Sequence, residues 1–262
     1  SYYFYFFFSE RGEVAGLEDA FVMFNNLFDV DVDLFVGQFQ ASDPLFKREL
    51  RLTFEDYQIY KTKIGNSRIN LAYDRGIMLN YGLPTGTDLT LEILNGNGID
   101  KANNFRNFDD DKYKNLLGRL SQDITKNIRL GALGYFGKEA LSLYENELNM
   151  FGVDATVNLE PVELNLQYLQ REDKNPYDLI NPQKVNSKGI MAELIYLPQG
   201  DDSKLYITGL FNWIELDKVN TYKTATLNIG YMLKRNVRVL SEYTYDMKWK
   251  FGKLSIGLVA AY

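Results

Sequence analysis

The stretch Val162-Glu163-Leu164-Asn165-Leu166-Gln167-Tyr168 alternates strictly between apolar and polar side chains. Successive side chains of a β-strand point to opposite faces, so its valine, leucines and tyrosine form one face and its polar residues the other. The same period of two recurs at 30–36, 225–231 and 237–245. This pattern predicts strands that each build one apolar wall and one polar wall.

The alternating segments and the connections between them form a second pattern along the 262 residues. About fourteen strands are expected, near 2–8, 19–26, 30–40, 70–81, 88–95, 115–124, 128–137, 147–158, 162–171, 188–197, 204–215, 223–233, 236–246 and 253–262. Short connections near 28–29, 83–87, 125–127, 159–161, 198–203 and 234–235 alternate with long ones at 9–18, 41–69, 96–114, 138–146, 172–187, 216–222 and 247–252. Short periplasmic turns and long external loops are typical of outer-membrane barrels.

The composition agrees with a chain that faces lipid on one side and water on the other. Aromatic residues make up 15% of the chain, yet hydrophobic residues reach only 45%. No apolar run is long enough for a transmembrane helix. We therefore predict one all-β domain over 1–262, a transmembrane antiparallel up-and-down β-barrel of about 14 strands. A chain that begins at Ser1 has either a processed or an incomplete N-terminus, and an incomplete one would add strands. A soluble sandwich or soluble barrel is the alternative.

The residue types that are missing limit the chemistry. The chain has no His and no Cys, which excludes Ser–His–Asp hydrolysis and His-ligated or Cys-ligated metals. No other pair of nucleophile and base has supporting spacing, so we expect neither an enzyme nor a bound cofactor or metal. A formal net charge of −6 argues against a nucleic-acid partner.

The connection 41–69 is too long for a simple turn, and loops of that length are usually functional. Folded into the lumen of a barrel, it would carry opposed charges to a constriction and select solutes by charge and size. Its candidate constriction residues are Lys47, Arg48, Glu49, Arg51, Glu55 and Asp56. The alternative is an external loop with ordinary surface charge.

Six charged residues inside the predicted strands fall on the polar face by alternation: Glu92, Arg119, Glu163, Glu193, Arg238 and Glu242. A charge turned toward lipid near the midplane costs roughly 2–4 kcal/mol, so these side chains are expected to line the lumen. They could equally be paired within the wall and play no part in transport. Arg75 breaks the alternation, which indicates either a bulge near Gly76 or a place at the membrane interface.

One part of the chain resembles a known family. Leu17-Glu18-Asp19-Ala20-Phe21, then Val36-Gly37-Gln38-Phe39 and Asp43-Pro44-Leu45-Phe46, are similar to the early hairpin of the phosphate-selective porins of the O/P type. The resemblance covers roughly 16–46, and the rest of the chain only through its rhythm of strands and loops. It implies an outer-membrane barrel that admits small solutes, often as a trimer. The family's basic phosphate-binding residues cannot be matched to positions here.

Two functions follow from these expectations. The first is a porin in the outer membrane of a Gram-negative bacterium, which forms a water-filled channel for passive diffusion of small hydrophilic solutes or ions. The second is a scaffold or sheath around a partner, such as a periplasmic multihaem cytochrome or a lipoprotein that fills the lumen. Other expected partners are outer-membrane lipid and two further copies in a homotrimer.

Overall fold

A computed structural model describes residues 2–8, 14–41, 51–100, 102, 106–234 and 236–260. For 2–8, 14–18, 201 and 220 it describes the backbone alone. Lys47, Arg48 and Glu49, together with Asp43-Pro44-Leu45-Phe46, lie outside the described residues.

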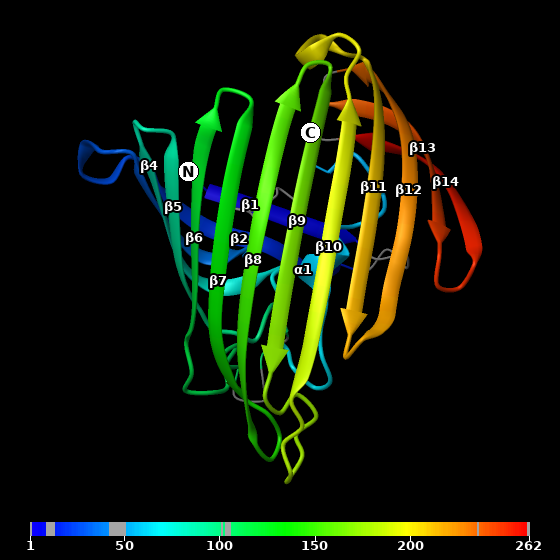
Figure 1. Ribbon diagram of the computed structural model, residues 1–262. Helices are drawn as coiled ribbons and strands as arrows, with labels where there is room; N and C mark the ends of the chain where they lie inside the picture. Colours follow the sequence, from blue (N-terminus) through cyan, green and yellow to red (C-terminus); the bar gives the residue numbers. More distant parts are fainter. Residues whose placement is uncertain are drawn as a thin grey trace.

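The described residues form a single antiparallel sheet that curls into a barrel (Figure 1). Each strand pairs with the next in sequence, which is the up-and-down order expected from the alternation. The strands are β1 (Tyr2–Phe8), β2 (Val14–Phe24), β3 (Val32–Phe39), β4 (Asp74–Leu83), β5 (Thr87–Leu94), β6 (Asn115–Thr125), β7 (Ile128–Ala140), β8 (Glu145–Leu159), β9 (Val162–Asp173), β10 (Val185–Tyr196), β11 (Leu205–Leu216), β12 (Val219–Lys234), β13 (Val237–Asp246) and β14 (Phe251–Ala260). The predicted fold class is confirmed.

Strand boundaries agree with the alternation to within a few residues, except in β2. That strand begins at Val14, five residues before the predicted start, because it continues to pair with β1 across two register shifts. Such irregularities interrupt a period of two, so alternation alone cannot follow a strand through them. The described part of the connection between β3 and β4 contains one short helix, α1 (Gln58–Lys61).

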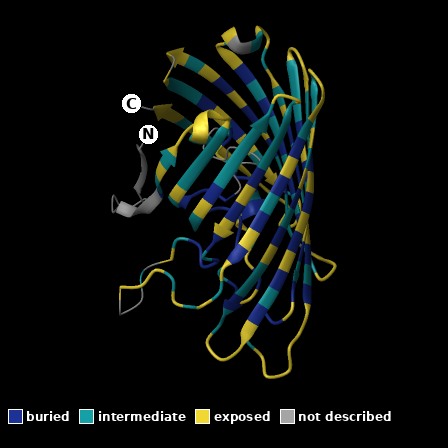
Figure 2. Cartoon of the chain, turned by 90° about the vertical axis from the view of Figure 1, so that its left-hand side faces the viewer, coloured by how far each residue is buried: buried dark blue, intermediate teal, exposed yellow. Residues whose placement is uncertain are grey.

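The two faces of the sheet have opposite character, and Figure 2 shows bands of buried and exposed residues along the strands that it colours by burial. Large apolar side chains are exposed on the outer face, for example Leu116 and Leu120 of β6, Phe136 of β7 and Phe151 of β8. In a barrel of this kind that face contacts lipid tails, so the exposure is stabilising in a membrane and unfavourable in water.

The inner face differs from the uniformly polar wall that alternation predicts. Inward-facing Leu133, Tyr135, Met150 and Leu169 belong to a buried apolar cluster that also contains Tyr60, from the connection between β3 and β4. The alternation gives the face of a residue, but it does not indicate which part of that face is covered by another segment. Part of the lumen is therefore packed with protein.

Arg75 faces outward and lies near the start of β4, at the end of the barrel where the long loops are. No register shift accompanies it in the ladders with β3 or β5, so there is no bulge at Gly76. Its guanidinium donates to the backbone oxygens of Gly98 and Asp100 and lies 4.3 Å from the ring centre of Phe108. Among the described residues, no helix is long and apolar enough to cross a membrane.

Candidate functional site

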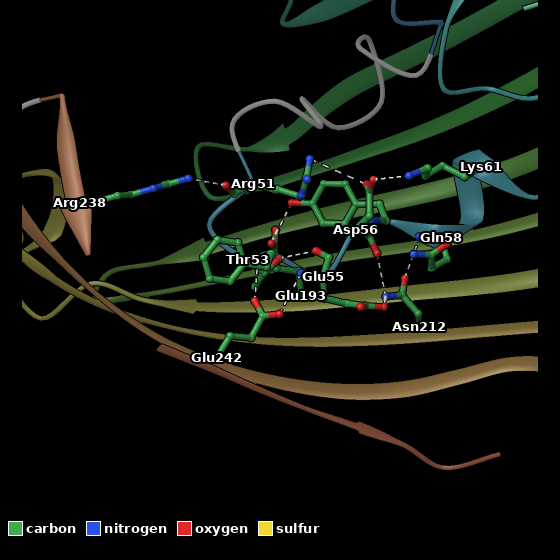
Figure 3. Close-up of polar contacts among 12 residues, drawn as sticks. Arg51, Thr53, Glu55, Asp56, Gln58, Lys61, Glu193, Asn212, Arg238 and Glu242 are labelled. Atoms are coloured by element: carbon green, nitrogen blue, oxygen red, sulfur yellow. Dashed lines mark hydrogen bonds and ion pairs between the residues drawn. The ribbon is translucent and has the colours of Figure 1, made fainter. Parts of the chain in front are cut away.

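The connection between β3 and β4 supplies the main feature of the inner face. Its described part, 51–73, is called the inner segment from here on. It runs across the inner wall and is bonded to inward-facing side chains of β7 and of β9 to β13. Figure 3 shows its contacts with Glu193, Asn212, Arg238 and Glu242. Strand pairing does not fix the position of the inner segment, so the side chains that contact it must do so.

At one end, Glu242 of β13 holds the main chain of the inner segment. Its two carboxylate oxygens accept the backbone N–H groups of Phe54 at 2.6 Å and Glu55 at 2.9 Å. Asn228 of β12 donates to the backbone oxygen of Leu52 at 3.0 Å. A carboxylate that accepts two backbone N–H groups is a strong anchor, because bonds to a charged acceptor contribute about 1.5–3 kcal/mol each.

The side chain of Glu55 lies against the wall beside this anchor. It accepts hydrogen bonds from the Tyr222 hydroxyl, from the Thr224 hydroxyl at 3.3 Å and from the Asn212 amide at 3.5 Å. Burial raises the pKa of the Glu55 carboxyl above its ordinary value, and the negative charge of Glu242 raises it further. Glu55 therefore becomes protonated at a higher pH than a solvated glutamate.

The middle of the inner segment is attached to β10 and β11. Asn212 accepts the backbone N–H of Gln58 at 3.2 Å and donates to the backbone oxygen of Asp56 at 3.0 Å. The Tyr57 hydroxyl donates to Glu193 at 2.8 Å. Both partners are at least nine-tenths buried, so the segment fills this part of the lumen and water does not separate it from the wall.

The other end is held by Arg171 of β9. Its guanidinium donates to the backbone oxygens of Ile69 at 2.6 Å and Thr62 at 3.3 Å, and to the Ser67 hydroxyl at 2.8 Å. It also pairs with Asp173 on the same strand through Nε at 2.7 Å and Nη2 at 2.8 Å. The three guanidinium nitrogens therefore donate five hydrogen bonds in total. A lysine could not replace this planar set of donors.

A buried polar chain extends this attachment to β7 and β8. Asn146 donates to Asp173 at 2.9 Å and to Glu139 at 3.0 Å, and Glu139 accepts the backbone N–H of Arg68 at 2.9 Å. Asn146 and Asp173 are fully buried. Buried carboxylates are stable only when their oxygens are hydrogen-bonded, so the inner segment and the wall satisfy each other.

The structure places the described candidate constriction residues at the start of the inner segment. Asp56 accepts from Lys61 at 2.9 Å and lies 4.0 Å from Arg51. The backbone oxygen of Arg51 accepts from Arg238 at 3.0 Å. Glu55 and Asp56 thus lie beside strand residues that alternation assigned to the lumen.

All six predicted lumen-lining charges are on the inner face, and they separate into two groups. Glu193, Arg238 and Glu242 contact the inner segment, whereas Arg119 pairs with Asp154 of β8 at 2.7 Å. Glu163 accepts from Asn165 at 2.8 Å, and Glu92 is buried beside Met78 and Leu117 in the ladder. The inner face therefore brings together three of the six at the segment and leaves the others on the wall.

Two cavities with a partly polar lining lie at opposite ends of the strands. One, of about 250 Å³, is at the end of β3 to β6 that carries the short turns, and Asp33, Asn80, Asp88 and Arg119 are among its lining residues. The other, of about 290 Å³, is at the end with the long loops, where Arg68 of the inner segment contributes to its lining. Polar space is therefore present near both ends of the strands.

Sequence reasoning missed Arg171, Asn212 and Glu139, although these side chains hold the inner segment. Each sits at a polar position of its strand, as dozens of others do. What distinguishes them is a main-chain partner more than 70 residues away, at Arg68, Ile69 or Asp56. No local signal reports a contact of that separation. No group of acidic residues arranged to hold a metal ion is present in the described part of the chain.

Comparison with known proteins gives a likeness at the level of structure. No protein-family model matches the sequence, and no curated protein matches it. An anion-selective porin from Comamonas acidovorans is similar with a TM-score of 0.69 and 10% identity, over 97% of this chain and 81% of that one.

Two further solved structures show the same likeness. A loop-deletion form of OmpT, an outer membrane protein of Vibrio cholerae, matches with a TM-score of 0.67 and 13% identity, over 97% of this chain and 82% of that one. The outer membrane channel DcaP of Acinetobacter baumannii matches with a TM-score of 0.62 and 14% identity, over 95% and 74%. This chain therefore has the barrel fold of outer-membrane porins.

Proposed function

We propose that this protein is a porin of a Gram-negative outer membrane, with a water-filled channel through which small hydrophilic solutes or ions diffuse passively. The observation that carries the proposal is the inner segment, which is bonded to the inner wall of a porin-type barrel at both of its ends. A segment attached in this way to β7 and to β9 to β13 would narrow the passage through the barrel. No catalytic role is proposed.

The inner segment is then the constriction of the channel. Arg51, Glu55 and Asp56 would lie at its narrow part together with Glu193 and Glu242 of the wall. Lys47, Arg48 and Glu49 precede the inner segment by a few residues and are proposed to contribute to the same constriction. Charges in a narrow, water-poor passage act on solutes more strongly than charges on an open surface.

The finer assignment, to phosphate-selective porins, stands as a separate proposal that rests on the resemblance over 16–46. Arg119 and Arg171, two of the inward-facing arginines, are each paired with an aspartate. An arginine paired in this way presents little free positive charge to a phosphate. We therefore propose a general channel for small solutes, within the wider group of porins.

The alternative of a sheath around a multihaem cytochrome or a lipoprotein would need space that the inner segment occupies. A lumen-filling partner would have to displace contacts such as those of Arg171 and Glu242. Copurification decides this point, since a stoichiometric partner that remains bound in detergent would favour the sheath.

We also propose that the channel is a homotrimer in outer-membrane lipid. OmpT of Vibrio cholerae has been solved in a trimer form, and its barrel is similar to this one with a TM-score of 0.58. Light scattering on the detergent-solubilised protein gives the mass of the assembly, and a mass of one chain would contradict the trimer.

Conductance in planar bilayers tests the main proposal. The purified protein should insert and produce discrete current steps of uniform size that increase in proportion to salt concentration. If no steps appear at any salt, in preparations whose barrel is folded by circular dichroism, the channel proposal is wrong.

A further inference from the structure

The short-turn half of the inner face has a charge pattern that the inner segment does not explain. We call this region the short-turn vestibule, and define it by Asp31, Asp33, Asp88, Arg119 and Glu163. It includes the cavity of about 250 Å³ at β3 to β6. Solutes that pass the inner segment would have to cross it.

Some polar atoms beside this vestibule are buried without a protein partner. The side chains of Arg119 and Asp154 are only 9% and 4% exposed. Nevertheless, Arg119 Nε and Asp154 Oδ2 have no hydrogen-bond partner among the described protein atoms. Buried polar atoms of this kind are normally satisfied by ordered water, so the lining of the cavity is wet.

Two arginines of the region are paired with carboxylates, whereas Arg238 of β13 donates to the backbone oxygen of Arg51. Arg119 is paired with Asp154 at 2.7 Å. Arg129, the neighbouring inward arginine on β7, is paired with Asp88 and lies 3.5 Å from Asp123. Each of these two paired arginines therefore offers a passing anion less attraction than its formal charge suggests.

Carboxylates remain in excess in the vestibule. Asp33 accepts the backbone N–H of Asn26 at 3.0 Å, and Glu163 accepts the Asn165 amide at 2.8 Å. Both partners are neutral, so they leave the negative charge in place. The carboxylate of Asp31 lies beside Gly82 of β4, where a Cβ would be 2.4 Å from its Oδ2.

We infer that the channel prefers cations over anions, and that Asp31, Asp33 and Glu163 of the short-turn vestibule are specificity-determining residues. This inference rests on the proposed function. A wet, narrow region with uncompensated carboxylates has a negative potential, and a potential of about −1 kT would enrich monovalent cations over anions about sevenfold. Screening weakens that preference, because the Debye length falls from about 30 Å at 0.01 M salt to about 3 Å at 1 M.

The test is a reversal-potential measurement in planar bilayers under a tenfold KCl gradient, with the wild-type protein and two matched double variants. The vestibule variant is Asp33→Asn with Glu163→Gln. The control is Glu160→Gln with Asp202→Asn, which makes the same change in net charge in exposed turns at the same end. We expect a permeability ratio of K⁺ to Cl⁻ of about 5 or more for wild type and control at low salt. The vestibule variant should lower this ratio at least about twofold.

Each result decides a different statement. Steps with a ratio at or below one would overturn the cation preference and leave the channel in place. A ratio above one that the vestibule variant does not change would overturn the assignment to these residues. If the vestibule variant fails to fold, the wild type still tests the inference, because its ratio must fall toward one as both solutions approach 1 M salt. Complete absence of steps would instead contradict the proposed function.

Discussion

Replacement of Arg171 by methionine should release one end of the inner segment while the barrel stays intact. The guanidinium makes three hydrogen bonds to the segment, at Thr62, Ser67 and Ile69, and two to Asp173. Methionine keeps most of the apolar volume but supplies no donor. The change therefore removes the attachment with little loss of packing.

The size of the effect follows from burial. Loss of one partner of a buried ion pair costs about 3–5 kcal/mol, because the other charge is left uncompensated. Asp173 retains only the amide of Asn146, at 2.9 Å, among its side-chain partners described here. If about 3 kcal/mol of this cost acts on the attachment, the released population rises by about two orders of magnitude. Release also exposes Asp173 to water, which favours it further.

Two assays report the released state. Trypsin should cleave the folded variant at Lys61, Lys63 and Arg68 far faster than wild type, since cleavage follows the open population when reclosing is fast. Single-channel recordings should show larger mean conductance and more frequent fluctuations. Cleavage sites are mapped by mass spectrometry, because the external loops also contain lysines.

Arg119→Met is the matched control. Arg119 is also buried and ion-paired, but its ion pair with Asp154 joins β6 to β8 and is not part of the attachment at Thr62, Ser67 and Ile69. This variant should lower thermal stability without an increase in cleavage at Lys61 or Arg68. If the two variants are cleaved at the same rate, or if Arg171→Met is as resistant as wild type, the attachment role of Arg171 is refuted.

Three further changes probe the opposite end and the middle of the inner segment. Glu242→Gln should weaken the anchor on the N–H groups of Phe54 and Glu55 by about 1.5–3 kcal/mol and raise single-channel conductance, which recordings at fixed salt would show. Burial raises the pKa of Glu55, so its folded form prefers the protonated state, and its contribution to stability falls as pH rises through that pKa. Because the pKa of Glu55 is raised above 4.5, acidification should begin to lower the cation preference of the wild type while the pH is still above 4.5. The decrease should be smaller in Glu55→Gln, and reversal potentials measured as a function of pH would show both results. Gly189→Val should displace the segment, because a Cβ there would lie 2.9 Å from Ile59 Cγ1, and tryptic cleavage would increase if it does.

The barrel could be predicted from sequence because its signal is local and repeated. In 162–168, every second residue reports the face of the strand, and lipid on one side makes an error of one residue costly. The alternation of short and long connections adds the direction of each strand. The first signal can be read within about ten residues and the second from the lengths of successive connections, so no tertiary information was needed.

The site could be predicted only in part. Glu193, Arg238 and Glu242 were assigned to the inner face from alternation, and they contact the inner segment in the structure. Arg171 obeys the same alternation but its role depends on Ile69, which is 102 residues away. The path of the inner segment decides which polar residues of the inner face it contacts. A period of two in the sequence contains no information about that path.

The apolar cluster explains why the inner segment takes a fixed path. Ile59, Tyr60 and Ile69 are buried against inward-facing Leu169 and Ile214. Burial of apolar surface contributes about 25 cal/mol per Å², but it is non-directional and would permit many positions. The hydrogen bonds at Arg171 and Glu242 have defined geometry and select one of them. With hydrogen bonds alone, the inner segment would lack the apolar burial that holds it against the wall. With apolar contacts alone, it could pack against the wall in many positions. Ile59 and Tyr60 pack in the middle of the inner segment, and the charged anchors hold its two ends. Loss of either anchor should therefore loosen one end while the centre stays packed. For this reason the Arg171 and Glu242 variants are expected to alter conductance without unfolding the barrel.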